Sequence, residues 1–333
     1  MKVRATAPGK LVVLGEYAVL AGAPALVLAV DRHCQAELGP SENEHCHLRI
    51  CAPQPEEMSF PVGAQSGVTL VDLVTGADTA GSASAWRGSV DSSGFFDGQT
   101  KLGIGSSAAA LTTWAAAWSI YTGQGNIARD VASLETLISL HRALQGGSGS
   151  GLDVAASLFG GAITYRLVPE LGPIVGSVRL PNSVGFTTVF TGRSASTRDL
   201  VAVYNDWRTA RPTEAAEQLQ ALERIAADGC AAARGNDAEQ FLTAVAAYGP
   251  RLEVLGECIG AEIVTGEHRE VAGYARRFDV VYKVSGAGGG DLGIALSADP
   301  EALTAFKEAV RVKYRVVDFR LDTAGLSVEE QTA

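Results

Sequence analysis

The stretch Lys101-Leu102-Gly103-Ile104-Gly105-Ser106-Ser107-Ala108-Ala109-Ala110 decides how this chain is interpreted. The alanine-rich run that follows it reaches Trp118 without Pro or Gly, so it predicts a helix. Glycines just before a helix let bare backbone approach a ligand, and a helix N-terminus offers unpaired N–H groups and a partial positive charge. The stretch therefore predicts a phosphate-binding loop, with Lys101 as a mobile charge beside it. A simple glycine turn capped by Ser is an equally good interpretation of these residues alone.

Two common phosphate-binding patterns do not fit the chain. Residues 103–108 match G-x-G-x-x-A, but a dinucleotide site also needs a preceding hydrophobic strand and an acidic residue near position 125 at the end of another strand. Residues 97–102 are polar, and residues 122–130 contain no apolar strand. A Walker loop at Pro8-Gly9-Lys10 fails as well, because Arg4 stands where that motif needs Gly and Leu11 where it needs Ser or Thr.

Length and composition limit the class of protein. A chain of 333 residues favours two domains. The amino-acid pattern changes between Pro169 and Pro181, which predicts domains at 1–180 and 181–333. Strands and helices mix without strict alternation, which predicts α+β layers. The net charge of −10 and the lack of a basic run argue against a nucleic-acid binder. With no signal peptide, no long apolar run and an odd number of cysteines, five, we expect a cytoplasmic protein without membrane contact.

Local patterns predict several elements and one negative result. We expect residues 53–66 to be a loop, residues 75–94 to be irregular, and a helix capped by Asn126 to run to about Leu144. The last residues carry no pattern. Six His and Cys residues lie close together in the sequence and raise the question of a metal site: His33, Cys34, His45, Cys46, His47 and Cys51. Their spacing fits no standard zinc template, so we interpret them as parts of strands.

Three further stretches could carry chemistry. Lys10 lies in an apolar segment before Gly15-Glu16-Tyr17, and such a lysine needs an anionic partner or must extend to solvent. The Gly-Ser run at 145–153 ends in Asp153, which would cap a helix, or accept or orient a hydroxyl proton. Its four glycines and two serines in six residues exceed what capping requires, which favours a function. The glycine-rich residues 285–291 are either a tight hairpin or a wall close to a ligand.

Taken in order, these stretches resemble the motifs of the GHMP kinase superfamily, which includes galactokinase, homoserine kinase, mevalonate kinase and phosphomevalonate kinase. The resemblance extends over residues 7–296 and rests on Ala-Pro-Gly-Lys…Gly-Glu-Tyr-Ala-Val-Leu, Gly-Ile-Gly-Ser-Ser-Ala-Ala and Ser-Gly-Ala-Gly-Gly-Gly-Asp. The Lys101 lead-in, the form of residues 285–291 and the run from His141 to Asp153 are most similar to the phosphomevalonate kinase branch. Residues 191–197 also resemble the substrate-side segment of that branch.

The resemblance implies an α+β fold with a ribosomal-S5-like N-terminal domain and a ferredoxin-like C-terminal domain, and ATP and Mg²⁺ in the cleft between them. It implies transfer of the ATP γ-phosphate to 5-phosphomevalonate, with Lys10, Lys101 and Asp153 as catalytic residues and Ser107 at Mg²⁺. The implied ATP-binding residues are Gly103, Ile104, Gly105, Ser106, Ser107 and Ala108. The implied substrate-binding residues are Glu16, Tyr17, Ser148, Ser150, Ser194, Ser196, Arg198, Gly288 and Gly289, with Arg193 a weaker candidate.

One departure from the family bears on the acceptor. Mevalonate kinases carry a metal-binding Glu about one helical turn before this loop, whereas this chain has His141 there. A neutral His is a poor Mg²⁺ ligand, because Mg²⁺ prefers oxygen. Mevalonate kinase, a sugar or homoserine kinase, and a non-catalytic binding protein of the same fold stay as alternatives. We expect a monomer or a homodimer.

Overall fold

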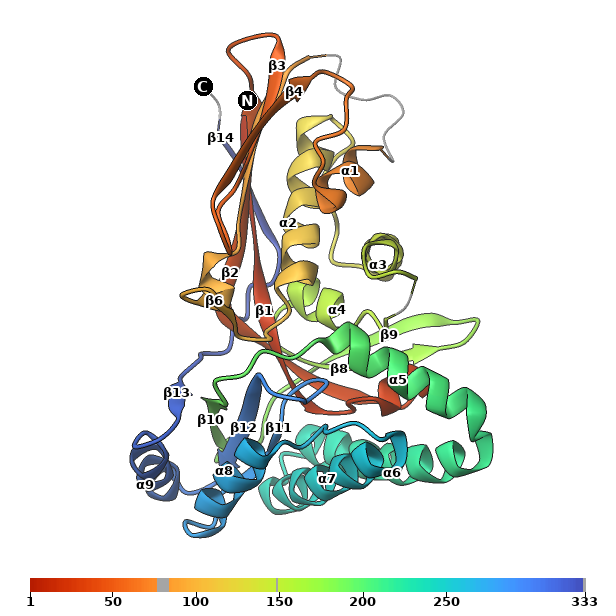
Figure 1. Ribbon diagram of the computed structural model, residues 1–333, viewed down its shortest axis with the longest axis vertical. Helices are drawn as coiled ribbons and strands as arrows, with labels where there is room; N and C mark the ends of the chain where they lie inside the picture. Colours follow the sequence, from red (N-terminus) through yellow and green to blue (C-terminus); the bar gives the residue numbers. More distant parts are fainter. Residues whose placement is uncertain (77–83, 148, 332–333) are drawn as a thin grey trace.

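The computed structural model describes residues 1–76, 84–147 and 149–331, and Figure 1 shows the course of the chain. The first part of the chain contains β1 (Lys2–Leu14), the 3₁₀ turn η1 (Ala18–Ala21), β2 (Ala25–Pro40), β3 (His45–Ile50), β4 (Glu56–Pro61), α1 (Thr69–Gly76), β5 (Trp86–Asp91), the 3₁₀ turn η2 (Ser93–Phe95), β6 (Phe96–Asp97), β7 (Thr100–Lys101), α2 (Ser106–Tyr121), α3 (Val131–Leu144), α4 (Leu152–Phe159), β8 (Ala162–Val168) and β9 (Gly172–Val178). The second part contains β10 (Gly185–Phe190), α5 (Thr197–Ala210), α6 (Pro212–Arg234), α7 (Ala238–Ile259), α8 (Gly266–Arg276), β11 (Val281–Val284), β12 (Leu292–Ser297), α9 (Pro300–Val310), β13 (Arg315–Val317) and β14 (Ser327–Gln331).

An eight-stranded sheet forms the upper half of the molecule in Figure 1. Its strand order is β14-β1-β2-β5-β3-β4, and the β8–β9 hairpin joins it through β2. Strand β2 is long enough to have two partners on one side, because Ala25–Leu28 pair with β8 and Gln35–Pro40 pair with β5. Strands β3 and β5 are parallel, and the other neighbours are antiparallel.

Helix α2 lies on one face of this sheet, with α1, α3 and α4 around it (Figure 1). Twelve of its sixteen residues are buried, so it is apolar on all sides, as expected for a helix inside a core. Its alanines allow close approach to β1 and β2, and Trp114 packs against Trp86 with ring centroids 5.6 Å apart. This packing fixes the N-terminus of α2 at mid-height of the molecule, where the site is built.

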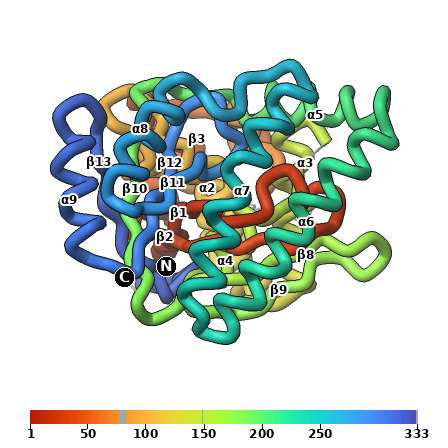
Figure 2. The backbone as a smooth tube through the Cα atoms, turned by 90° about the horizontal axis from the view of Figure 1, so that it is seen from below, coloured from red at the N-terminus to blue at the C-terminus, as the bar shows by residue number. Residues whose placement is uncertain are grey.

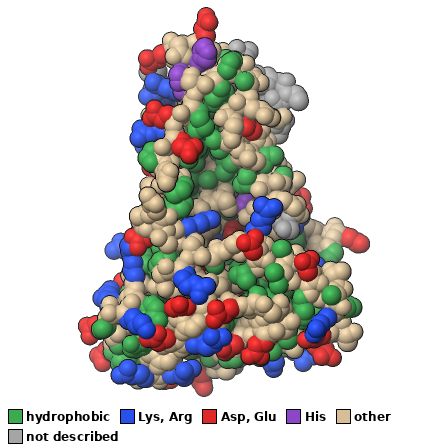
Figure 3. Space-filling model, viewed as in Figure 1, with side chains coloured by type: hydrophobic (Ala, Val, Ile, Leu, Met, Phe, Trp, Pro, Cys, Tyr) green, Lys and Arg blue, Asp and Glu red, His purple; other side chains and the backbone are tan. Residues whose placement is uncertain are grey.

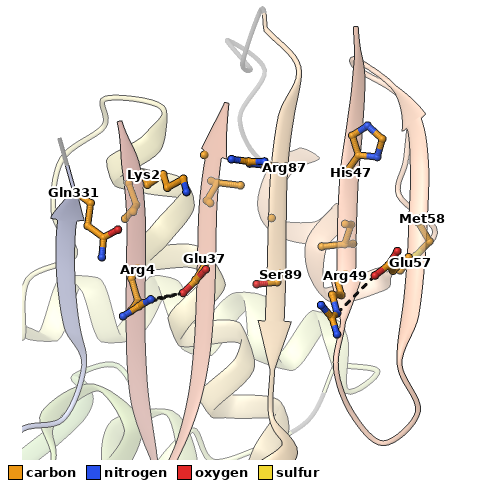
Figure 4. Close-up of a pocket in the computed structure, with 15 residues that line it drawn as sticks. Lys2, Arg4, Glu37, His47, Arg49, Glu57, Met58, Arg87, Ser89 and Gln331 are labelled. Atoms are coloured by element: carbon orange, nitrogen blue, oxygen red, sulfur yellow. Dashed lines mark hydrogen bonds and ion pairs between the residues drawn. The ribbon is translucent and has the colours of Figure 1, made fainter. Parts of the chain in front are cut away.

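The opposite face of the sheet carries the side chains of Arg4, Glu37, Arg49 and Glu57, in front of the strands in Figure 4, with helices behind them. A hollow of about 620 Å³ lies on this face, but most of its charges are already paired. Arg4 pairs with Glu37 at 2.7 Å and Arg49 with Glu57 at 3.7 Å. Arg87 pairs with Glu42 at 3.0 Å, so three of the four Lys and Arg side chains that line this hollow already have an anionic partner, which argues against a site for an anion.

The lower half of the molecule is a four-stranded antiparallel sheet, β11-β12-β10-β13, between two groups of helices. Strand β12 shows why both faces are covered. Leu292, Ile294 and Leu296 face the main core, whereas Ala295 points to a second core with Phe306. Figure 2 shows α6 and α7 side by side, with α8 and α9 farther along the sheet.

The mixed α+β architecture expected from the sequence is confirmed, but four details of the expectation are wrong. Residues 53–66 contain the edge strand β4, residues 75–94 contain β5, and the last residues contain β14. Strand β14 pairs with β1, so its partner is at the other end of the chain and no local pattern reveals it. Asp130, not Asn126, caps α3, because its side chain accepts a hydrogen bond from the N–H of Ser133.

The division at residue 180 stays a prediction. Apart from the short pair β6 and β7, the strands up to the end of β9 at Val178 belong to the eight-stranded sheet. The next strand, β10, begins at Gly185 and belongs to the four-stranded sheet. The C-terminal β14 nevertheless returns to the first sheet, so the last residues lie with the N-terminal half.

Candidate active site

The glycine loop, residues 103–105, lies directly on β1. The backbone N–H of Lys10 donates to the carbonyl of Ile104 at 2.9 Å. A Cβ at Gly9 would come within 2.8 Å of that same carbonyl, so Gly9 is what permits the contact. Gly105 has φ of 83° and offers no side-chain cap to α2. The first-turn N–H groups of a 16-residue helix are therefore free of a side-chain cap at the site.

A second helix begins at the site in the same way. Gly151, with φ of 84°, precedes α4 and offers no side-chain cap. Two side chains hold the loop before it: Arg142 Nε donates to the Gly149 carbonyl at 2.9 Å, and the Tyr165 hydroxyl donates to the Ser150 carbonyl. Asp153 lies in the first turn of α4. This rigid loop brings Asp153 toward β1.

Lys10 and Asp153 form an ion pair beneath the glycine loop. Lys10 Nζ lies 3.6 Å from Asp153 Oδ1, and Lys10 is only 6 % exposed. A Cβ at Gly105 would be 3.2 Å from Lys10 Cγ, so the loop covers the stem of the lysine. Of the two possibilities open for Lys10, the structure shows pairing with an anion rather than extension into solvent.

His141 is buried next to Ser107. Its Nε2 lies 3.1 Å from Ser107 Oγ and 3.3 Å from the Gln145 amide nitrogen, which can only donate. Nε2 therefore accepts. Burial lowers the pKa of His141, and the charge of Lys101 lowers it further, against the opposing effect of Asp153. The neutral ring adds no charge to the site at neutral pH.

Residues Ser285–Asp291, here the third loop, close the site from the lower half. The Ser285 hydroxyl contacts both the N–H and the carbonyl of Val12 at 3.0 Å, and the Tyr17 hydroxyl donates to the Ala287 carbonyl. The Glu16 carboxylate pairs with the buried Lys283 ammonium and accepts the Gly286 N–H at 3.4 Å. Glu16 therefore anchors the wall of the site through its carboxylate.

These elements enclose a pocket of about 300 Å³, and Figure 3 shows the molecule hollowed between its two halves with Lys and Arg side chains at the rim. Predicted site residues that line this pocket are Lys10, Glu16, Tyr17, Lys101, Gly103, Gly105, Ser107, Ser150, Asp153, Ser196 and Arg198. The cationic side chains of Lys10, Lys101 and Arg198 face it together with the carboxylates of Glu16, Asp153 and Asp291. The two helix N-termini, rather than the net charge of the lining, therefore favour an anionic ligand.

Other predicted residues lie outside the pocket lining. Ile104, Ser106 and Ala108 are buried within the glycine loop and the first turn of α2. Gly288 and Gly289 face the protein, because a Cβ at Gly288 would come within 2.8 Å of the Ile263 side chain and the Gly289 N–H donates to the Ile263 carbonyl. The remaining predicted residues are Ser194, which is exposed, and Ser148, which lies outside the described residues.

Sequence reasoning missed Asp291, which also lines the pocket. Burial raises the pKa of its carboxyl, against the lowering effects of the Ala195 N–H, Lys10 and Lys101. The signal available was the break in the glycine run, where an acidic residue stands in place of another Gly. Other lining residues that sequence reasoning did not single out include Gln145 and the apolar Val12, Val19, Leu20 and Val201.

The described part of the chain contains no group of three or more His, Cys, Asp or Glu residues placed to hold a metal ion. Within residues 1–76, 84–147 and 149–331, none of the helices combines the length and apolar character needed to span a bilayer.

Comparison with known proteins places the chain among small-molecule kinases. No protein-family model matches it. It is 31 % identical over 346 residues to the phosphomevalonate kinase of Streptomyces sp. (strain CL190), covering 89 % of this chain and 90 % of that protein. It is 26 % identical over 339 residues to the mevalonate kinase of Aeropyrum pernix, covering 98 % of each.

A solved structure agrees with these sequence relatives at the level of the fold. Streptococcus pneumoniae phosphomevalonate kinase, in complex with phosphomevalonate and AMPPNP, superimposes with a TM-score of 0.78 at 19 % identity, over 96 % of this chain and 99 % of that one. Together with the ordered glycine motifs around one pocket, the Streptomyces relative shows that this chain belongs to the GHMP kinase superfamily.

Proposed function

We propose that the protein is an ATP-dependent phosphomevalonate kinase, which transfers the γ-phosphoryl group of ATP to the phosphate of 5-phosphomevalonate and yields 5-diphosphomevalonate and ADP. One observation carries the proposal: two helices, α2 and α4, begin at glycine caps at the same pocket, with Lys10 between them. Each helix N-terminus favours an anionic group. Two anion-binding termini suit a reaction in which donor and acceptor both carry phosphate, and the Streptomyces relative supports the same acceptor.

ATP binds at the glycine loop in this proposal. The backbone of residues 103–108 and the first turn of α2 hold its phosphates, and Lys101 neutralises part of their charge. The donor set fits a Mg²⁺ ion that arrives with ATP: Ser107 Oγ and the Asp153 carboxylate line one pocket, without a dedicated protein cage among the described residues. When bound there, Mg²⁺ would supply charge neutralisation of the phosphates.

The reaction needs positioning more than proton transfer. An oxygen of the acceptor phosphate attacks the γ-phosphorus, the bond from that phosphorus to the β–γ bridging oxygen breaks, and ADP leaves with the electron pair. The acceptor phosphate is already ionised near neutral pH, so no proton has to be removed. Lys10 stabilises the transferring group, and Asp153, 3.6 Å from Lys10 Nζ, holds that ammonium in place.

The acceptor lies on the side of α4 and α5. Arg198 supplies the cation there, and it is positioned against the backbone of the preceding loop: a Cβ at Gly146 would be 3.4 Å from its guanidinium. Ser150 and Tyr17 line the same pocket, although the Ser150 hydroxyl already accepts the N–H of Leu152 at 3.4 Å and the Tyr17 hydroxyl already donates to the Ala287 carbonyl. Ser196 contributes less, because its hydroxyl already accepts the N–H of Asp199 as the cap of α5.

Mevalonate kinase is the second candidate, because the Aeropyrum relative carries that name and matches 98 % of the chain. An alcohol acceptor must lose a proton, so Asp153 would then act as a base. The neutral, nitrogen-bearing His141 beside Ser107 favours the first candidate, since it supplies no carboxylate oxygen for a metal.

A coupled ADP-release assay with phosphomevalonate, mevalonate, homoserine and galactose tests the proposal. We expect kcat/KM for phosphomevalonate to exceed that for mevalonate by about a thousandfold, because the cationic acceptor side would be left unpaired by an alcohol. Lys10→Met should abolish turnover, whereas Lys2→Met, on the same strand but outside this pocket, should not change it. Turnover of mevalonate alone would refute the proposed acceptor.

A further inference from the structure

Asp291 connects three parts of the site that are far apart in the sequence. Its N–H donates to the Arg193 carbonyl at 2.7 Å, and its carbonyl accepts the N–H and hydroxyl of Thr191 at 3.0 and 3.1 Å. Its side-chain Oδ1 accepts the Ala195 N–H at 3.2 Å. Asp291 therefore holds the segment Thr191–Ser196, which leads into α5.

The same carboxylate is in contact range of the glycine loop. A Cβ at Gly103 would come within 2.7 Å of Asp291 Cβ and would overlap the carboxylate, so the missing side chain of Gly103 is what leaves room for Asp291. Lys10 and Lys101 both act on the charge of Asp291. Through one side chain the glycine loop of the upper half thus meets the segment before α5 in the lower half.

The backbone of Asp291 is unusual in a way that suits a fixed role. Its φ is 55°, in the left-handed region that residues other than Gly seldom adopt, although Asp and Asn tolerate it. A glycine would satisfy the backbone here more easily and would match the glycines that precede it. Replacing Asp291 by glycine therefore removes the carboxylate without straining the backbone, which makes its role testable.

We propose that Asp291 is a positioning residue that couples the glycine loop to the segment Thr191–Ser196, so that nucleotide bound at the loop slows opening of the Ala195 N–H bond. The physical basis is that the Asp291 carboxylate packs directly against Gly103 and also accepts the Ala195 N–H. A ligand that restricts the motion of Gly103 therefore also restricts the motion of this carboxylate. The inference rests on the proposed placement of ATP on the glycine loop, and it is independent of the acceptor's identity.

Hydrogen–deuterium exchange of the Ala195 amide, with and without AMPPNP, tests this coupling without any acceptor. In the wild-type protein we expect nucleotide to slow exchange about tenfold, a value in keeping with one hydrogen bond to a charged group. In Asp291→Gly, which relieves the left-handed backbone, the ratio of the two rates should fall to about one. If Asp291→Gly instead speeds exchange equally with and without AMPPNP, so that the ratio of the two rates stays at its wild-type value, the hydrogen bond has only a structural role and the proposal is overturned.

Two further variants sharpen the test. Asp291→Asn keeps an oxygen acceptor for the Ala195 N–H, so the coupling should survive, and its loss would overturn the role given to this hydrogen bond. Asp279 is the matched control, because it is also an Asp with φ of 56° but is exposed and outside the pocket, so Asp279→Gly should behave as wild type. Calorimetry of AMPPNP binding separates the two proposals: binding without protection of Ala195 overturns the coupling alone, whereas no binding overturns both.

Discussion

The buried pair of Lys283 and Glu16 predicts a large, non-additive loss of stability when one partner is removed. The side chains are 0 % and 2 % exposed, and Lys283 Nζ also donates to the Val284 carbonyl at 2.6 Å. Burial lowers the pKa of Lys283, while Glu16 opposes that shift. Lys283→Met leaves the Glu16 carboxylate buried without its cation. We expect a loss of about 3–5 kcal/mol in the free energy of unfolding.

The double variant shows where this loss arises. Glu16→Gln alone leaves the ammonium uncompensated and should cost a similar amount, while its amide oxygen can still accept the Gly286 N–H. Combining Glu16→Gln with Lys283→Met removes both charges. Because the desolvation cost of the two ions then disappears, the double variant should recover about 2–4 kcal/mol relative to the sum of the single variants.

Urea unfolding followed by circular dichroism measures all four corners of this cycle. Lys313→Met is the matched control, because Lys313 pairs with Glu270 at 2.6 Å on the surface of the same half, with side chains 56 % and 39 % exposed. Its unfolding free energy should be close to that of wild type. Two outcomes would refute the assignment of an uncompensated buried charge. One is a loss of unfolding free energy in the double variant equal to the sum of the losses in the single variants, and the other is a Lys283→Met variant as stable as Lys313→Met.

Three other predictions concern the site and its supports. Lys10→Met should lower kcat by at least about a thousandfold in a folded protein, and Asp153→Asn by less, which steady-state ADP release would show; equal losses would argue that Asp153 has a direct role. Gly105→Ala should raise KM for ATP about tenfold, because its φ of 83° and its 3.2 Å distance to Lys10 Cγ leave no relaxed place for a methyl group; an unchanged KM would contradict this. His268 is buried, its pKa is lowered by burial from 6.5 to about 4, and it contacts the Gly290 carbonyl at 2.9 Å. The unfolded state then binds more protons, so about 3 kcal/mol of stability should be lost as pH falls from 6.5 to 4, and His268→Gln should show no such loss in urea unfolding at pH 7 and pH 4.5.

Local sequence patterns were sufficient for the parts of the site made by contiguous residues. The glycine loop, the first turn of α2, and the loop ending in Asp153 were predicted because glycine spacing and helix starts depend on neighbours in the chain. Lys10 could be singled out because a charge in an apolar run needs a partner, although the sequence did not identify Asp153 as that partner from the residues alone.

Contacts between distant segments were beyond local patterns. Glu16 and Lys283 are 267 positions apart, so no local pattern reveals that their side chains pair inside the protein, and the substrate role expected for Glu16 stays a prediction. Gly288 and Gly289 were predicted to contact the substrate because their neighbours in space could not be inferred from the sequence. In the structure both lie against Ile263. Strand β14 was missed because its hydrogen-bond partner is β1, at the start of the chain.

The chemical nature of the acceptor is the central claim, and ³¹P NMR of the reaction products tests it most directly. With ATP and 5-phosphomevalonate we predict two new, mutually coupled phosphorus signals of a diphosphate in addition to the coupled pair of ADP, with loss of the 5-phosphomevalonate signal, and no such additional pair with mevalonate. A single new monoester signal from mevalonate, with 5-phosphomevalonate unchanged, would contradict the claim.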